Sequence, residues 1–307
     1  MTPNAGEIAA LLTALCFSAS SIFFTMAGRV FGPLISNRLR LLIAVILLWI
    51  THWIAFGSPI PWEAERQQWF WLSISGIVGL AIGDFFLFKA YVSIGPRLGL
   101  LFLSLSPALA TILAWILLGE TINAGSIFAI FLTLIGIAWV VLESKPELKT
   151  SNDLPSIQSR EVYIKGIIAG LIAATGQALG MVLAKKGLSH DLPALSGNVI
   201  RMTAAFIALW AVTIIQGQVL STIQQAGNYK SGLIYILIGA FFGPLIGVSL
   251  SLFAIQKTNI GIASTIIALP PIFLLPIGHF IFKEKITWQA IVGTVMAITG
   301  VSLLILL

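Results

Sequence analysis

Long apolar runs that carry almost no charge are the feature that most constrains how this 307-residue chain can fold. A helix needs about 20 apolar residues to cross the hydrocarbon core of a bilayer. Because backbone groups in lipid must find hydrogen bonds within their own segment, such runs are expected to be α-helices. The sequence predicts an all-α integral membrane protein with ten transmembrane helices. The expected spans are 7–27, 34–56, 69–93, 98–118, 122–142, 164–184, 197–216, 231–254, 260–282 and 287–307.

The composition excludes several classes of function. Hydrophobic residues make up 58% of the chain and charged residues only 9%, whereas a soluble domain has about 25% charged residues. A soluble protein of this size could not keep so much apolar surface from water, so a soluble enzyme, a disordered chain and a nucleic-acid binder are excluded. The net charge of +6 is spread thinly, as is typical of loop charges that orient a membrane protein. We expect the lipid bilayer and a small-molecule substrate as partners, and no nucleic acid.

Motifs for catalysis, nucleotide hydrolysis or metal binding are absent from the sequence. There is one cysteine, Cys16, and the three histidines, His52, His190 and His279, have no ligand spacing. No phosphate-binding loop or nucleophile motif is present. We therefore expect no enzymatic activity, no metal and no cofactor, with a proton as the candidate coupling ion.

The two halves of the chain repeat each other at a constant distance. Pro107 is followed 13 residues later by Glu120, and Pro271 is followed 13 residues later by Glu284. Each member of the second pair lies 164 residues after its counterpart in the first. The glycine pairs with the same separation are Gly83–Gly247 and Gly136–Gly300. This pattern predicts one five-helix unit that is present twice.

The only long polar stretch divides the chain between these units. We expect a first repeat at 1–142, a polar linker at 143–162 and a second repeat at 163–307. Because five spans is an odd number, the second repeat must enter the membrane from the opposite side. Two inverted repeats are typical of secondary transporters, whose substrate site lies at the repeat interface near the midplane.

Motifs in both halves resemble one transporter family. The first half has Ser104-Leu-Ser-Pro107 followed by Leu117-Leu-Gly-Glu120, and the second has Leu269-Pro-Pro271 followed by Phe282-Lys-Glu284. Over its whole length the chain resembles EamA-type transporters of the drug/metabolite transporter superfamily. The resemblance implies a central cavity within helices one to four and six to nine, with helices five and ten at the periphery. Such relatives export amino acids and other metabolites, or carry sugar phosphates, nucleotide sugars or lipid-linked sugars.

Two departures from the family narrow the substrate class. The superfamily's small multidrug exporters carry an acid in the middle of the first helix, whereas this chain has Cys16 and small neighbours there. Its sugar-phosphate carriers place a lysine before the mid-helix proline, whereas here Ser106 and Pro270 hold those places. These differences disfavour cationic drugs and phosphorylated substrates.

Asp84 is the most informative polar residue. It lies about 4.5 Å along the helix from the centre of the span 69–93, where a carboxylate costs about 2.5–3.5 kcal/mol to insert. It either binds an amine or a coupling proton, or it forms a structural pair. Lys89 is an awkward intrahelical partner, since five residues place it about 140° around the helix, and its side chain can instead reach the interface.

Two arginines occupy equivalent places in the two halves. Arg40 follows Asn37 by three residues, and Arg201 follows Asn198 by three, so each pair shares one helix face. The two guanidinium groups either clamp a substrate carboxylate from both sides or mark the ends of their spans.

Other residues complete the candidate site. Pro107 and Pro271 each fall near the middle of a span, and they predict either hinges for alternating access or static kinks. Ser21 on the first span and Gln177 on the sixth are candidates to line a cavity, with close helix packing as the alternative.

We expect a secondary active transporter that moves a small polar metabolite, an amino acid or a related organic solute, outward by alternating access. The alternatives are a flippase for a lipid-linked sugar, a transporter of another metabolite class, and a scaffold that transports nothing. We expect a multi-pass protein of a bacterial inner membrane, either a monomer or a homodimer.

Overall fold

The computed structural model describes residues 5–118, 124–143, 157–187, 192–257, 266–267, 269–274 and 287–306. All of the regular secondary structure in these ranges is helical. The elements of the first repeat are α1 (Ala5–Phe56), α2 (Arg66–Gly76), the π-helix η1 (Ile77–Gly83), α3 (Asp84–Leu103), α4 (Ser106–Leu118) and α5 (Ala124–Glu143). Those of the second are α6 (Ile157–Gly187), α7 (Ala194–Ile215), α8 (Val219–Asn228), α9 (Lys230–Ala240), the π-helix η2 (Phe241–Gly247), α10 (Val248–Lys257) and α13 (Trp288–Leu306).

Gly-Pro steps divide two of the long helices into separate spans. In α1 the backbone of Gly32 has φ 77° and ψ 164°, and in α3 that of Gly95 has φ 83° and ψ 163°. Only glycine adopts this conformation readily. The following Pro33 or Pro96 then suits the first turn of the next helix, where no amide donor is needed. The expected boundaries before residues 34 and 98 are therefore breaks inside continuous helical stretches.

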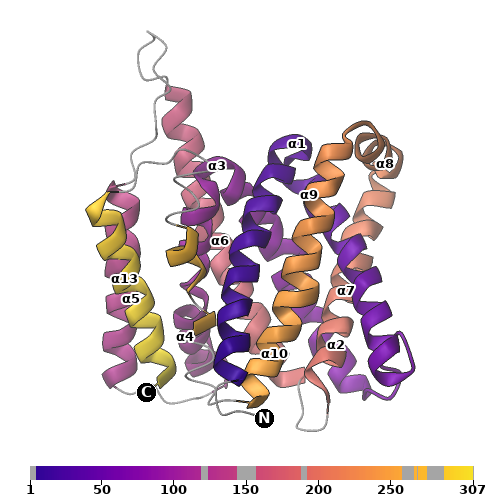
Figure 1. The fold of residues 1–307 in the computed structure, drawn as a ribbon, viewed down its shortest axis with the longest axis horizontal. Helices are drawn as coiled ribbons and strands as arrows, with labels where there is room; N and C mark the ends of the chain where they lie inside the picture. The colour runs from indigo at the N-terminus through magenta and orange to yellow at the C-terminus, as the bar shows by residue number, and fades with distance from the viewer. Residues whose placement is uncertain are drawn as a thin grey trace.

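Six helical stretches among the described residues are long and apolar enough to cross a membrane, and Ala5–Phe56 and Arg66–Leu103 are the two that contain these breaks. Most of the expected span 260–282 lies outside the described residues. The total of ten transmembrane helices therefore stays a prediction. The helices run side by side, and α1 begins at the same end of the bundle at which α13 ends (Figure 1).

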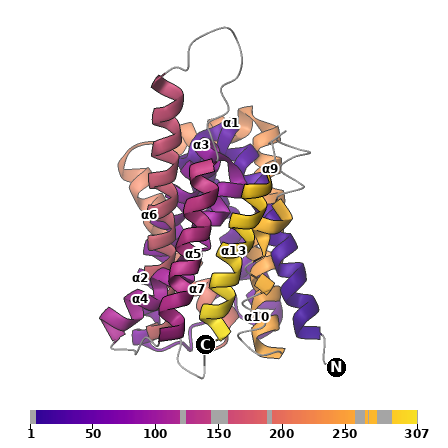
Figure 2. The same cartoon turned by 90° about the vertical axis from the view of Figure 1, so that its left-hand side faces the viewer.

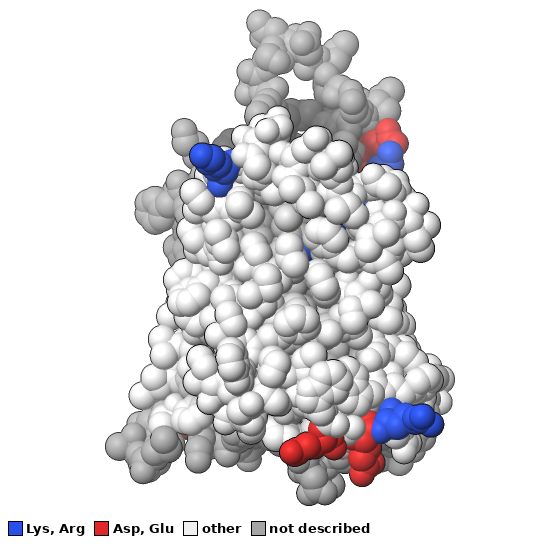
Figure 3. Space-filling view, turned by 90° about the vertical axis from the view of Figure 1, so that its right-hand side faces the viewer, with Lys and Arg blue, Asp and Glu red and all other residues white. Residues whose placement is uncertain are grey.

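The surface carries a broad belt that suits a lipid environment. On the face shown in Figure 3, charged side chains gather near the two ends of the molecule, and the zone between them is almost free of charge. Large hydrophobic side chains such as Ile54, Ile116, Phe128 and Ile207 are exposed on the surface of the molecule. Exposed apolar surface of this extent indicates contact with lipid rather than with water.

The helices α5 and α13 form a pair at one edge of the bundle (Figures 1 and 2). A Cβ at Gly136 would clash with the backbone of Ala297, and a Cβ at Gly300 would clash with the backbone of Thr133. Small residues at these crossings let two helix backbones approach closely, which is how helices commonly associate in lipid. The peripheral position that the family resemblance implies for helices five and ten is the position of this pair.

Each π-helix packs against the first helix of the other repeat. The helix η1 lies on α6, where a Cβ at Gly180 would come 3.1 Å from the Cα of Gly79. The helix η2 lies on α1, where a Cβ at Gly247 would come 2.7 Å from the ring of Phe17. The two π-helices begin and end 164 residues apart. The repeats are therefore interleaved rather than stacked as separate bodies.

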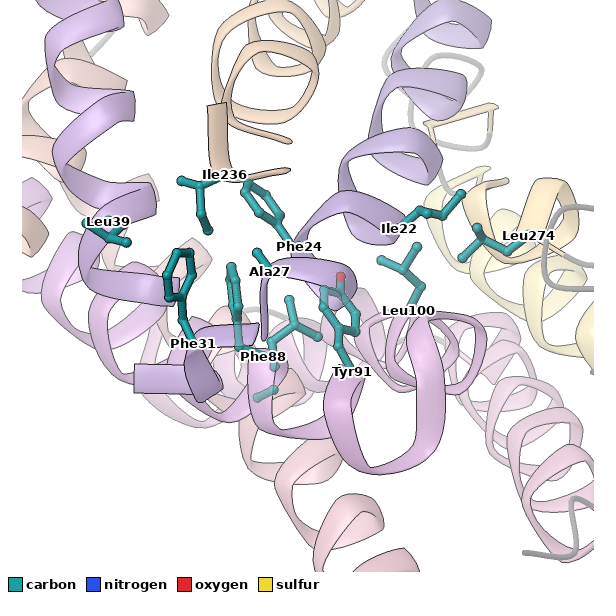
Figure 4. Close-up of a cluster of buried hydrophobic side chains, with 12 residues drawn as sticks. Ile22, Phe24, Ala27, Phe31, Leu39, Phe88, Tyr91, Leu100, Ile236 and Leu274 are labelled. Atoms are coloured by element: carbon teal, nitrogen blue, oxygen red, sulfur yellow. The ribbon is translucent and has the colours of Figure 1, made fainter. Parts of the chain in front are cut away.

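A cluster of buried side chains holds α1 against α3 and α9 (Figure 4). The ring centroids of Phe24 and Phe88 are 5.1 Å apart, and those of Phe88 and Tyr91 are 6.1 Å apart. Phe88 of this aromatic layer also lies against Arg40, which belongs to the polar site described in the next subsection.

Candidate polar site around Asp84

A buried ion pair forms the centre of the candidate site. Asp84 is the first residue of α3 and directly follows η1, and its carboxylate Oδ2 lies 2.6 Å from Nη2 of Arg40 on α1. The two residues are only 4% and 6% exposed. The guanidinium of Arg40 also lies over the ring of Phe88, 5.7 Å from its centroid. Low solvent access strengthens this attraction and makes either charge costly to leave alone.

The π-helix provides acceptors for this cluster. In a π-helix the backbone N–H groups donate five residues back, as that of Asp84 does to the carbonyl of Gly79. A carbonyl oxygen has a second lone pair that can also accept from a side chain. Asn37 Nδ2 donates to the carbonyl of Ala81 at 3.0 Å, and Arg40 Nη2 donates to that of Leu80 at 3.1 Å. Gln177 Nε2 donates to the carbonyl of Gly79 at 3.1 Å. Three successive carbonyls of η1 thus accept hydrogen bonds from side chains of two other helices.

Gln177 links the site to the second repeat. Its Nε2 also donates to Asp84 Oδ1 at 2.5 Å. Close packing makes this reach possible, since a Cβ at Gly176 would lie 3.0 Å from the Cα of Gly83. Both carboxylate oxygens of Asp84 therefore have partners, Arg40 on one and Gln177 on the other.

Asn37 holds the ion pair in place from the same helix face. Its Oδ1 accepts a hydrogen bond from Nε of Arg40 at 3.2 Å, as the spacing of three residues predicts. The guanidinium is thus fixed by Asn37, Leu80 and Asp84 together. The interpretation of Arg40 as a marker of a span end does not fit this burial.

Arg201 on α7, three residues after Asn198, approaches the same π-helix from the second repeat. Arg201 interacts electrostatically with Asp84, and its Nη2 would lie 3.7 Å from a Cβ at Gly79. In the described part of the structure, Nε of Arg201 and Nδ2 of Asn198 are buried and have no hydrogen-bond partner. The two equivalent Asn-x-x-Arg motifs therefore face one carboxylate in different ways.

Two other candidate residues lie apart from this cluster. Ser21 donates to the carbonyl of Ser18 on its own helix at 2.7 Å, so its hydroxyl is used within α1. Lys89 is half-buried further along α3, and the ion pair of Asp84 is with Arg40 instead. The structural pairing considered for Asp84 thus exists, but its partner is on another helix.

The helices break just before both candidate hinge prolines. Between α3 and α4 the chain turns at Ser104 and Leu105, and Pro107 lies in the first turn of α4. In the second repeat, Leu269 accepts a turn bond from Ile272 N at 2.9 Å, just before Pro271. Ser106 and Pro270 contact the opposite repeat at these breaks, through Ala174 and Ser18 respectively.

Sequence reasoning did not foresee the π-helices or the aromatic ring beneath Arg40. The available signal was the spacing of Gly79 and Gly83 on η1 and of Gly176 and Gly180 on α6. Facing Gly-x-x-x-Gly motifs indicate close helix packing in lipid. They indicate neither a π-helix nor the partner of a buried acid.

The side chains that meet here suit charge pairing and the exchange of hydrogen-bond partners. Within the described part of the chain, no group of three or more His, Cys, Asp or Glu side chains could hold a metal ion. What converges on η1 is two guanidinium groups, one carboxylate and the side-chain amides of Asn37 and Gln177.

Comparison with known proteins agrees with this architecture. The family model of EamA-like transporters matches residues 4–142 and 164–306, once in each half. No curated protein matches the chain in sequence. A solved structure described only as a crystal structure of a protein superimposes with a TM-score of 0.57 at 16% identity. The match covers 98% of this chain and 96% of that one, and it shows a shared fold.

Proposed function

The chain belongs to the EamA-like transporter family, and we propose that it moves a small polar metabolite, an amino acid or related organic solute, out of the cell by alternating access. Membership of this family identifies the chain as a membrane transporter of the drug/metabolite transporter superfamily. The substrate class, the direction and the mechanism are the proposal.

The observation that carries the proposal is a buried charged cluster built from both repeats. Asp84 and Arg40 come from the first repeat, whereas Gln177 and Arg201 come from the second. Ionisable groups inside a membrane bundle commonly mark a substrate or ion path. A bond that crosses the repeat interface must change when the repeats move, so it links the state of the site to the conformation of the protein.

The helix breaks supply the moving parts of this mechanism. They occur beside Pro107 and Pro271, at equivalent places of the two repeats, and each contacts the first helix of the opposite repeat. In inverted repeats, a movement that opens one side of the membrane has a mirror movement that opens the other. Protonation of Asp84 would release Arg40 and Gln177, which makes a proton the natural coupling ion.

The test compares solutes inside and outside cells that produce the wild-type protein or Asp84→Asn at equal membrane abundance. Arg160→Gln is the control, because Arg160 is an exposed arginine on α6. A few small solutes should shift with the wild type and the control but not with Asp84→Asn. Equal shifts in all three would refute the role of Asp84. If no soluble compound shifts with the wild type, the alternative of lipid-linked sugar flipping is tested in liposomes.

A further inference from the structure

The repeated site has two basic motifs but one acid. Asp84 begins α3 directly after η1, and Val248 begins α10 directly after η2, 164 residues later. A valine therefore stands where the repeat would place a second carboxylate. Both copies of Asn-x-x-Arg are nevertheless present, at Asn37 and Arg40 and at Asn198 and Arg201.

This difference leaves donors without acceptors in the second copy only. Asn37 donates to a carbonyl of η1, and Arg40 donates to Asn37, Leu80 and Asp84. In contrast, Asn198 is only 9% exposed. Among the described residues, neither its Nδ2 nor Nε of Arg201 has a hydrogen-bond partner. Buried polar groups are nearly always paired, so these atoms indicate that an acceptor is missing.

The charge of the described cluster points to the same conclusion. Two guanidinium groups lie near one carboxylate, and Arg201 is part-buried, so the described cluster carries one positive charge more than Asp84 neutralises. An anionic group beside Arg201 would neutralise this charge. Arginine binds carboxylates especially well, because its planar donors match the two carboxylate oxygens.

We propose that Asn198 and Arg201 bind the carboxylate of the transported solute, and that Arg40 and Asp84 form the fixed half of the site. Both oxygens of Asp84 already have partners, so an amine finds no acceptor there in this conformation. The substrates are therefore carboxylates, organic acids as well as amino acids, and amines that lack an acid group are excluded. This assignment rests on the proposed function, because it describes the same site.

The first test places an anion in the assigned position within the protein itself. On α1 the Nε of Arg40 donates to Asn37 Oδ1 across three residues, and Asn198 and Arg201 have the same spacing on α7. Asn198→Asp should therefore raise the Tm of the purified full-length protein in the absence of any ligand. Asn37→Asp is the matched control and should lower it, because Arg40 already has Asp84 as its anionic partner and the carbonyl of Ala81 would lose its amide donor. An Asn198→Asp protein that unfolds at or below the wild-type temperature overturns the proposal.

The second test uses three probes with one carbon skeleton: 3-methylbutanoate, L-valine and isobutylammonium, each titrated at constant ionic strength. A ligand that binds the folded state raises its Tm. The two carboxylates should raise the Tm of the wild type more than isobutylammonium does. The concentration needed should rise about tenfold or more in Arg201→Gln, and Asn198→Asp should not respond. An equal response of the wild type and Arg201→Gln contradicts the assignment.

These measurements separate the anion site from transport. If Asn198→Asp is stabilised while no solute moves in cells, the anion site stands and the proposed function fails. If cells move amines or neutral solutes, and Arg201→Gln moves them equally well, transport stands and the anion site is wrong.

Discussion

Asp84 and Gln177, 93 residues apart in sequence, are joined by a 2.5 Å hydrogen bond that connects the two repeats. The carboxylate belongs to the first turn of α3 and the amide to α6. The same amide nitrogen also reaches the carbonyl of Gly79 on η1. One side chain of the second repeat therefore donates both to a charged group and to a backbone carbonyl of the first.

The ion pair between Asp84 and Arg40 should show strong coupling in a double-mutant cycle. Removing one partner of a buried pair costs about 3–5 kcal/mol, because the other charge remains buried. Asp84→Asn and Arg40→Gln should each lower the free energy of unfolding. The double variant should lose less than the sum of the two. Unfolding of the purified proteins in one detergent measures this, and additive losses would show that the pair does not contribute as a unit.

Replacement of Gln177 should destabilise the interface between the repeats. Gln177→Leu leaves the carbonyl of Gly79 and one oxygen of Asp84 without this donor, at a cost of about 1–3 kcal/mol. Gln224→Leu on α8 is the control, because that glutamine is exposed. Thermal unfolding should separate the two variants. Equal Tm values would mean that the bond contributes nothing.

The crossing of α5 and α13 should not tolerate a side chain at its contact point. In Gly136→Ala the new Cβ would meet the backbone of Ala297. Overpacking of this kind costs about 1–3 kcal/mol. In contrast, a Cβ at Gly227 on α8 meets nothing within 4 Å, so Gly227→Ala should be neutral or slightly stabilising. A Tm for Gly136→Ala as high as that of Gly227→Ala would contradict this packing.

Arg38 should anchor the short helix α8 to the bundle. It is 2% exposed, and its guanidinium donates to Thr222 on α8 at 3.2 Å and to Gln218 at 2.8 Å. We expect Arg38→Gln to speed amide hydrogen exchange in residues 216–228 and to leave exchange in α5 unchanged. Arg160→Gln should alter neither segment. Unchanged exchange in residues 216–228 would show that other contacts hold α8.

The sequence by itself determined the membrane spans and many of their boundaries. Hydrophobic length is a local property, because each helix satisfies its own backbone. The expected spans 7–27, 34–56, 69–93, 164–184 and 231–254 accordingly fall on described helical stretches, whereas 98–118 is interrupted between α3 and α4. The Gly-Pro steps at Gly32 and Gly95 are local as well, since the conformation depends on one residue and its neighbour. The repeat of 164 residues was also visible as a pattern of prolines, glutamates and glycines.

Only the tertiary structure decided which polar groups meet. Asp84 pairs with Arg40 on α1 rather than with Lys89, which is nearer in sequence. Ser21 and Gln177 were both candidates to line a cavity, but Ser21 bonds within α1, whereas Gln177 crosses to Asp84. The two Asn-x-x-Arg motifs are alike in sequence. Only the packing of α1, α6 and α7 around η1 supplies acceptors for Asn37 and Arg40. Among the described residues it leaves donor atoms of Asn198 and Arg201 without acceptors. A hydrogen bond between distant segments depends on the position of both backbones, and no local pattern carries that information.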